Sequence, residues 1–332
     1  MHDKIDFVIT WVNGDDPRWQ AEKRRYDKNV DYSNDDRKAR YRDLDTLKYW
    51  FRSVEKNAAW VNKIYFVTWG HIPTWLNTNN DRLIIVKHDD FIPKQYLPTF
   101  NSCAIEMNLH RIKGLSENFV YFNDDMFVMN KTKPTDFFKN GKPRDAAILS
   151  VITPSGKDMF EHRLVNNSTV LNRRYKLIPV IKKHPFKWFN PKYGTKQFQS
   201  VPLIFKKKFS TIRISHIPSS LKKSTFRYLW ENERSAMENT SSQRFRSITC
   251  VNPWLVQALQ MASGDFCPRS PKFGKLIKIS DDMSEVSNTI KHDKSKLLCV
   301  NDSAEVRNIE KAKTELVNAF EEKFPDKSSF EK

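Results

Sequence analysis

The sequence predicts an α/β fold with a mainly parallel sheet in a Rossmann-like core, a basic second half and a C-terminal amphipathic helix. Short apolar runs rich in aromatic and β-branched residues alternate with segments of helical spacing through residues 5–125, a pattern typical of βαβ units. Residues 162–230 hold sixteen Lys and Arg and no Asp or Glu. Near the end, one helix face collects the apolar residues Ile309, Ala312, Leu316, Ala319 and Phe324.

In chain order, the first expected element is a strand over residues 7–12, followed by the loop 13–17, and then a polar, charged stretch over residues 18–41. Asp43 is the expected N-cap of a helix with apolar positions at Leu44, Leu47, Phe51, Val54 and Ala58. Strands at 63–69 and 83–86, a helix at 104–112, a strand ending at Asp124 and a helix at 252–262 follow. Residues 271–300 are polar, and we expect a loop there.

Composition excludes several classes of protein. A chain of 332 residues with 39% hydrophobic residues can bury a full core and is not of the disordered class, and 8 Gly argue against a repeat architecture. The charged start Met1–Asp6 does not resemble a signal peptide, and no apolar run is long enough to span a membrane. We therefore expect a cytoplasmic protein, peripheral at most at the inner face of a bacterial membrane, with four free cysteine thiols.

Two adjacent carboxylates, Asp124 and Asp125, directly follow the apolar run 119–122. Ligands of open α/β sheets bind beyond the carboxyl ends of the strands, and two acids placed there repel each other unless a cation lies between them. A divalent metal that carries a phosphorylated substrate is one solution. A turn or a helix cap formed by Asn123 and Asp124 explains the same residues equally well. On the first reading, this half of the chain binds a nucleotide-sugar.

The acid-free stretch over residues 162–230 predicts a surface that attracts anions. Nucleic acid, an acidic membrane or a phosphorylated substrate would each fit such a field. A merely solvated basic face usually contains some acids, so their absence favours a functional surface. Zinc-finger, RNA-binding and helix-turn-helix patterns are missing, and we expect no nucleic-acid partner.

Candidate site residues stand at three further places in the chain. After the first strand, Gly14 would let the backbone approach a ligand closely, and Asn13 or Asp16 could bind ribose hydroxyls, although a tight turn explains these residues as well. His216 follows a strand-like run inside the basic segment and suits a general base, with neighbouring cations expected to lower its pKa. Most lone histidines are structural. Arg246 precedes the helix at 252–262 and could bind phosphate oxygens, although pairing with a surface carboxylate is as common.

Together these segments resemble the Stealth family of sugar-1-phosphate transferases, which includes bacterial capsule and exopolysaccharide phosphotransferases and the lysosomal-enzyme N-acetylglucosamine-1-phosphotransferase. The first conserved region is similar to residues 5–17, and the second to a long span from Arg42-Asp43-Leu44-Asp45 through Leu97-Pro98-Thr99-Phe100-Asn101-Ser102 to Asn123-Asp124-Asp125. The third resembles Ser215-His216-Ile217-Pro218, and the fourth Leu298-Cys299-Val300-Asn301-Asp302. The chain departs from the bacterial pattern at Asn13, where Asp is frequent, and at Thr249-Cys250, where acids are frequent.

The resemblance implies a reaction and assigns residues to it. A sugar-1-phosphate, hexose or N-acetylhexosamine, would pass from a UDP-sugar donor to a hydroxyl of an oligosaccharide or lipid-linked saccharide acceptor, with release of UMP. Mg²⁺ or Mn²⁺ would be held by Asp124, Asp125 and Asp302, and His216, Arg246 and Asp125 would be catalytic. The implied substrate-binding residues are Trp11, Asn13, Gly14, Asp16, Arg42, Asp43, Asn101 and Ser102.

Two other functions remain open at this stage. A metal-dependent glycosyltransferase would use the same type of fold and metal but release UDP, and a nucleic-acid-binding protein would use the basic stretch alone. We expect three parts: residues 1–145 bind the nucleotide-sugar and the metal, and residues 146–270 complete the same active site. Residues 271–332 form a loop and a helix that pack back on the core.

Overall fold

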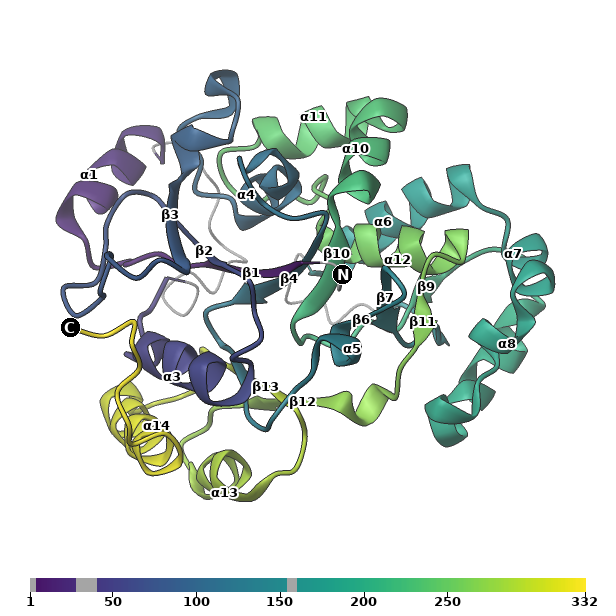
Figure 1. Cartoon of the computed structure of the whole chain (residues 1–332). Coiled ribbons are helices and arrows are strands. Elements are labelled where there is room, and N and C mark those ends of the chain that lie inside the picture. The colour runs from purple at the N-terminus through teal and green to yellow at the C-terminus, as the bar shows by residue number, and fades with distance from the viewer. Residues whose placement is uncertain (1–3, 28–40, 154–159) are drawn as a thin grey trace.

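The computed structural model describes residues 4–27, 41–153 and 160–332, and a five-stranded sheet lies at its centre (Figure 1). The strand order is β10-β4-β1-β2-β3, and all neighbours are parallel except β10, which is antiparallel to β4. The bounds are β1 (Ile5–Thr10), β2 (Ile64–Thr68), β3 (Leu83–Lys87), β4 (Asn118–Asn123) and β10 (Ser219–Lys222). The expected mixed α/β fold with a mainly parallel sheet is confirmed.

The order of these strands creates a switch point between β1 and β4. The chain moves outward from β1 to β2 and β3, and then returns to the other side of β1 to form β4. Loops that leave β1 and β4 therefore diverge, and ligands of open α/β sheets bind in the crevice that such divergence leaves. Thr10 pairs with Asn123 in the parallel register, so both strands end at the same level.

Helices cover both faces of the sheet and give two hydrophobic cores (Figure 1). One face carries α3 (Leu47–Asn57), α13 (Ser284–His292) and α14 (Ile309–Lys323), which pack against Phe7, Ile9 and Phe122. The other face carries α4 (Ser102–Met107), α6 (Phe160–Arg174), α10 (Lys223–Asn232), α11 (Arg234–Ser242) and α12 (Pro253–Ser263). Alternation of side chains along β1 explains the division, because Phe7 belongs to one core and Val8 to the other.

Smaller elements extend this frame. The remaining strands are β5 (Met126–Val128), β6 (Phe138–Lys139), β7 (Lys142–Asp145), β8 (Leu149–Ser150), β9 (Thr211–Ile212), β11 (Cys267–Pro268), β12 (Gly274–Lys278) and β13 (Leu297–Asn301). The remaining helices are α1 (Pro17–Tyr26), α5 (Pro134–Phe137), α7 (Leu177–Lys183), α8 (Pro185–Trp188), α9 (Val201–Ile204) and the 3-10 helices η1 (His88–Asp90), η2 (Lys94–Tyr96), η3 (Leu109–Arg111), η4 (Pro191–Ser200) and η5 (Pro271–Phe273). Within the described ranges, every helix is too short or too polar to cross a bilayer.

Two local predictions were wrong. Residues 271–300 are not a loop: they contain β12, α13 and β13, and β13 pairs with β5 beside the central sheet. Helix α3 begins at Leu47 with Thr46 as its N-cap residue, because the Asp43 carboxylate accepts the Asp45 amide at 2.8 Å in a turn of its own. The polar stretch after residue 17 starts with α1, whose N-terminal amides are capped by Asp16. Residues 28–40 of that stretch lie outside the described residues.

Helix α14 of the C-terminal segment packs against the central core. Ala312, Leu316 and Phe320 of α14 are buried in the same core as α3. The boundaries at residues 145 and 270 stay a prediction.

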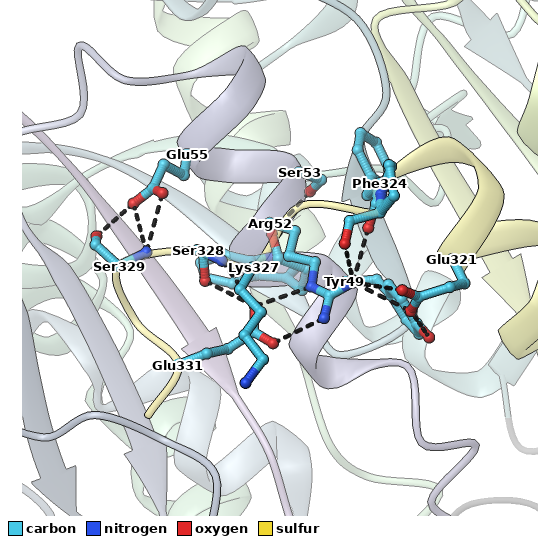
Figure 2. Close-up of polar contacts among 12 residues, drawn as sticks. Tyr49, Arg52, Ser53, Glu55, Glu321, Phe324, Lys327, Ser328, Ser329 and Glu331 are labelled. Atoms are coloured by element: carbon cyan, nitrogen blue, oxygen red, sulfur yellow. Dashed lines mark hydrogen bonds and ion pairs between the residues drawn. The ribbon is translucent and has the colours of Figure 1, made fainter.

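A buried arginine ties the C-terminal segment to α3 (Figure 2). Arg52 donates to both carboxylate oxygens of Glu331 at 2.9 and 3.0 Å, to Glu321 at 3.1 Å and to the Phe324 carbonyl at 2.8 Å. The Arg52 and Glu331 side chains are each only 6% exposed. Removal of one partner from a buried, fully bonded pair leaves an uncompensated charge, which is costly.

We predict that Arg52→Met lowers the free energy of unfolding at neutral pH by about 3–5 kcal/mol. Burial opposes the charged form of Glu331, but hydrogen bonds from Arg52 and Ser328 outweigh it and hold its pKa below the ordinary 4.5. A lowered pKa stabilises the fold above the unfolded-state pKa, and this contribution is lost as the pH falls. The Arg52→Met variant lacks this contribution to stability. The difference in the free energy of unfolding between wild type and Arg52→Met should therefore shrink toward acid pH.

Urea unfolding at pH 7 and pH 4 measures this difference. The matched control is Arg234→Met, which breaks the exposed pair with Glu238 and should change stability by no more than about 0.5 kcal/mol. An equal loss of stability at both pH values would contradict the assignment of the effect to the Glu331 charge.

Candidate active site

A cavity of about 960 Å³ opens where β1 and β4 end. Its wall combines Thr10 and Trp11 after β1, Asn123 to Met126 after β4, and residues from the basic half and the C-terminal segment. The volume falls within the range of ligand-binding clefts. The switch point of the sheet is therefore the site where the chain could hold a substrate.

Four carboxylates meet on one side of this cavity: Asp43, Asp124, Asp125 and Asp302. Burial and the repulsion of Asp125 and Asp43 raise the pKa of Asp124 to about 8. Burial also raises the pKa values of Asp43 and Asp302, although Arg42 opposes the shift at Asp302. The predicted juxtaposition of Asp124, Asp125 and Asp302 is thus present, and a cation bound between them would relieve their mutual repulsion.

Asp125 is the point where the three parts of the chain touch. Its backbone carbonyl accepts the Val300 amide at 2.8 Å, and its carboxylate accepts the Cys299 thiol at 3.2 Å. The Nε2 atom of His216, from the basic half, lies 3.7 Å from the same carboxylate oxygen. The other oxygen, Oδ1, is buried and has no hydrogen-bond partner among the described residues. A carboxylate of this kind retains capacity for one further ligand.

The pKa of His216 was predicted to be lowered by neighbouring cations, and this prediction was wrong. Burial disfavours the imidazolium, but the carboxylates of Asp125 and Glu106 outweigh burial and Arg246, so the pKa of His216 is raised. The sequence showed the sixteen cations of the segment but not that His216 faces the carboxylates of Asp125 and Glu106. The ring also packs edge-on against Trp254, with the ring centroids 6.1 Å apart.

Arginine side chains also line the cavity. Arg246 donates to the Ser102 hydroxyl from Nε at 3.1 Å and from Nη2 at 2.8 Å, which holds its guanidinium at the start of α4. Arg42 pairs with Asp302, with Nη1 3.1 Å from Oδ2. The structure therefore brings together Arg246, Ser102 and Arg42, as expected for residues of one site, and all three line the cavity.

Arg163 is a site residue that the sequence analysis did not single out. It lies on α6, lines the cavity and is only 7% exposed. Its Nη1 atom has no hydrogen-bond partner within the described part of the chain. The signal was available, because Arg163 shares the spacing of the buried Asn167, Val170 and Leu171 and so interrupts the inward face of the helix with a charge.

Glu106 is a second residue of this kind. It lines the cavity, accepts the Tyr121 hydroxyl at 3.1 Å, and has its pKa raised to about 8, first by burial. Tyr121 in turn bonds the Thr10 hydroxyl at 3.0 Å. These three side chains join β4, β1 and α4 below the cavity.

Four predicted substrate-binding residues make contacts within the scaffold, and the described cavity wall does not include them. Asp16 caps α1, and the Asn13 carboxamide accepts the Asp15 amide at 2.9 Å. Asn101 caps α4 and donates to the Gln243 carbonyl at 2.9 Å. A Cβ atom on Gly14 would lie 2.0 Å from the Tyr41 carbonyl oxygen. The lack of a side chain at Gly14 therefore leaves room for the backbone of Tyr41. Of the predicted substrate-binding set, Trp11, Arg42, Asp43 and Ser102 line the cavity.

The residues present fit a hard divalent cation. The carboxylates Asp124, Asp125 and Asp302 offer oxygen ligands of the type that Mg²⁺ and Mn²⁺ prefer, and the buried Asp125 Oδ1 has an open valence. Asp125, His216 and Cys299 also come within 4.8 Å of one another, a softer donor set. Burial and the Asp125 carboxylate raise the pKa of Cys299 well above its usual range, so its thiol remains protonated and donates to Asp125.

Comparison with known proteins places this site in a family. Residues 3–31 match the model of Stealth protein CR1, conserved region 1, and residues 40–145 match Stealth protein CR2, conserved region 2. The capsular polysaccharide phosphotransferase WcwK of Streptococcus pneumoniae is 41% identical over 331 residues, which cover 99% of this chain and 98% of that protein. The receptor polysaccharide phosphotransferase WefC of Streptococcus oralis is 39% identical, and coverage is 99% of each chain.

A further relative and one solved structure complete the comparison. The exopolysaccharide phosphotransferase cps2G of Lactiplantibacillus plantarum is 38% identical over 333 residues, with 99% of this chain and 96% of that protein covered. The crystal structure of the galactosyltransferase LgtC aligns over 94% of this chain and 95% of its own, with a TM-score of 0.41 and 10% identity. Full-length identity of about 40% to several phosphotransferases decides the assignment: the chain belongs to the Stealth family of capsular and exopolysaccharide phosphotransferases.

Proposed function

We propose that this enzyme transfers hexose-1-phosphate or N-acetylhexosamine-1-phosphate from a UDP-sugar to a hydroxyl of an oligosaccharide or lipid-linked saccharide. The acceptor oxygen forms a bond to the phosphorus that carries the sugar, the bridging P–O bond of the pyrophosphate breaks, and UMP leaves. One observation carries the proposal: a single cavity is lined both by four carboxylates, Asp43, Asp124, Asp125 and Asp302, and by the basic side chains of Arg163, Arg246 and His216. Phosphoryl transfer needs both a cation-binding side and positive groups around the transferred phosphorus.

His216 is the proposed general base. The Asp125 carboxylate lies near Nε2 and favours the proton on that nitrogen, which leaves Nδ1 to accept the proton of the acceptor hydroxyl. Asp125 thereby orients the ring and stabilises the imidazolium that forms. The raised pKa of His216 makes the imidazolium a stable product of that proton transfer.

The two arginines are proposed to bind the transferred phosphoryl group. Ser102 holds the Arg246 guanidinium in place through two hydrogen bonds, and Arg163 reaches the same cavity with an unused N–H among the described contacts. Guanidinium groups fixed before the reaction stabilise charge on phosphate oxygens at little cost in reorganisation. Asp124, Asp125 and Asp302 would hold a divalent metal, whose chemistry when bound is to neutralise charge on the pyrophosphate.

The identity of the nucleotide product tests the proposed function. Purified enzyme supplied with a UDP-sugar and a saccharide acceptor should release UMP in proportion to a new phosphodiester. Chromatography of the nucleotides together with ³¹P NMR of the saccharide product measures both. Release of UDP with no phosphorus in the saccharide product would overturn phosphotransfer in favour of glycosyl transfer.

His216→Ala should lower kcat by about 100- to 10,000-fold, the usual contribution of a positioned general base. The affinity for the UDP-sugar should stay near wild type, because the proposed role begins only with the acceptor hydroxyl. Steady-state kinetics and donor titration calorimetry separate the two effects. The matched control is His292→Ala, an exposed histidine on α13, which should keep full activity. A His216→Ala variant that turns over at the wild-type rate would exclude the base role.

Asp124→Asn should weaken Mn²⁺ binding by at least roughly tenfold, since even groups that only support a metal ligand contribute about 10–100-fold to affinity. The variant should also be more stable than wild type in the absence of metal, because one of the repelling carboxylates is gone. Thermal unfolding with and without Mn²⁺ measures both, and the exposed Asp89→Asn serves as control. An equal rise of Tm with Mn²⁺ in wild type and Asp124→Asn would place the ion elsewhere.

A further inference from the structure

Residues 176–208 form a continuous stretch of short helices that we call the lysine-phenylalanine segment. It contains α7, α8, η4 and α9, and it holds nine Lys, no Arg and no Asp or Glu. Figure 1 shows α7 and α8 at the edge of the molecule, on the far side of β9 and β11 from the central sheet. The proposed catalytic residues His216, Arg163 and Arg246 lie outside this segment.

Three phenylalanines of this segment are exposed to solvent. Phe186 is 83% exposed, Phe198 65% and Phe205 82%, and no other large apolar side chain in the described ranges exceeds 52%. Lysines that are themselves exposed flank them, namely Lys182, Lys183, Lys192, Lys206, Lys207 and Lys208. Isolated apolar side chains on a surface are ordinary. It is unusual that the three most exposed large apolar side chains of the described ranges all lie in one basic, acid-free segment.

The segment is held firmly in the fold, so the exposure of its phenylalanines is built in. Trp188 is 1% exposed and Tyr193 2%. The Tyr193 hydroxyl donates to the Lys187 carbonyl at 2.6 Å, and Lys187 Nζ donates to the carbonyls of Gly264 and Phe266 at 2.6 and 2.9 Å. The backbone that carries the exposed phenylalanines is therefore held in place by buried neighbours. Their exposure is a property of an ordered surface.

The segment also borders the cavity. Lys196 of η4 lines the cavity wall together with Arg213, and the Ser200 hydroxyl accepts the Leu149 amide of β8 at 2.9 Å. Ser150, the next residue of β8, lines the wall as well. A surface that docks through Phe198 and Phe205 would hold the cavity close to whatever it binds.

We propose that the lysine-phenylalanine segment docks the enzyme on an anionic lipid bilayer. The phenylalanines enter the boundary between headgroups and acyl chains, and the lysines contact anionic headgroups. The chemistry favours lipid over nucleic acid: the segment presents phenylalanines, which have no polar tip, and compact lysine charges, and it contains none of the arginines that stack on bases and clamp phosphates. If the proposed function holds, docking brings the cavity to a lipid-linked acceptor.

Co-sedimentation of the full chain with vesicles tests the proposal. Wild type should bind vesicles that contain phosphatidylglycerol, bind phosphatidylcholine vesicles much more weakly, and lose binding as salt increases. The triple variant Phe186→Ser, Phe198→Ser, Phe205→Ser should bind the anionic vesicles at least tenfold less. Ile72→Ser, which changes an exposed apolar residue outside the segment (41% exposed), should bind as wild type does.

A second variant isolates the charges. Lys182→Gln, Lys183→Gln, Lys206→Gln, Lys208→Gln should remove the preference for phosphatidylglycerol over phosphatidylcholine. Thermal unfolding should be unchanged in both variants, because the altered side chains are exposed. Wild-type protein that ignores anionic vesicles, or that binds single-stranded RNA through the same phenylalanines in their place, would overturn the proposal. Vesicle binding needs no turnover, so its failure and a failure of the UMP assay are distinguishable.

Discussion

Mutual repulsion among Asp43, Asp124, Asp125 and Asp302, which meet in the cavity where β1 and β4 end, is the physical constraint on which the rest of the site depends. The parallel register of Thr10 with Asn123 forces Asp124 and Asp125 into the switch point of the sheet, where burial raises the cost of their charges. Asp43 and Asp302 add to that cost. Basic residues from distant segments of the chain lie beside these acids, because β4 and the adjacent β1 contain no basic residue. The positive groups that line the cavity, His216, Arg42, Arg163 and Arg246, all lie outside β1 and β4 in the sequence.

This constraint also explains why the C-terminal segment belongs to the site. Strand β13 pairs with β5 directly after the acids and delivers the Cys299 thiol and the Val300 amide to Asp125. The strand is covered by α14, which Arg52 fastens to α3 through Glu321 and Glu331 (Figure 2). Stability at the C-terminus and geometry at Asp125 therefore depend on the same packing, although more than a hundred residues separate the two strands in sequence.

The sequence was a good guide wherever function and local pattern coincide. The strand that ends in Asp124 was recognised because an apolar run stops abruptly at charged residues. His216 was singled out because it stands in the acid-free segment, and Arg246 because it precedes the helix at 252–262. Prediction failed where a tertiary partner decides the outcome. Asp43 looked like a helix cap, but its carboxylate serves a turn ahead of Thr46. β13 looked like part of a loop, since its pairing partner lies far away in sequence. The pKa of His216 is raised by Asp125 and Glu106, which contact or approach the ring in the fold but lie far from it in the sequence.

The basic half places positive charge in two locations, the cavity wall and the outer surface. The composition of the segment alone does not distinguish the two. Arg163, Lys196, Arg213 and His216 face the cavity, where positive charge offsets the acids and suits a phosphorylated substrate. The lysines beside Phe186 and Phe205 point to solvent, where they offset nothing in the protein. An Asp or Glu in residues 162–230 would weaken the positive potential at the cavity wall and at the outer surface, since only a few short helices separate them. The complete lack of Asp and Glu from residue 162 to residue 230 is consistent with the two proposed roles of this half, in which one set of cations serves the cavity and another serves the outer surface.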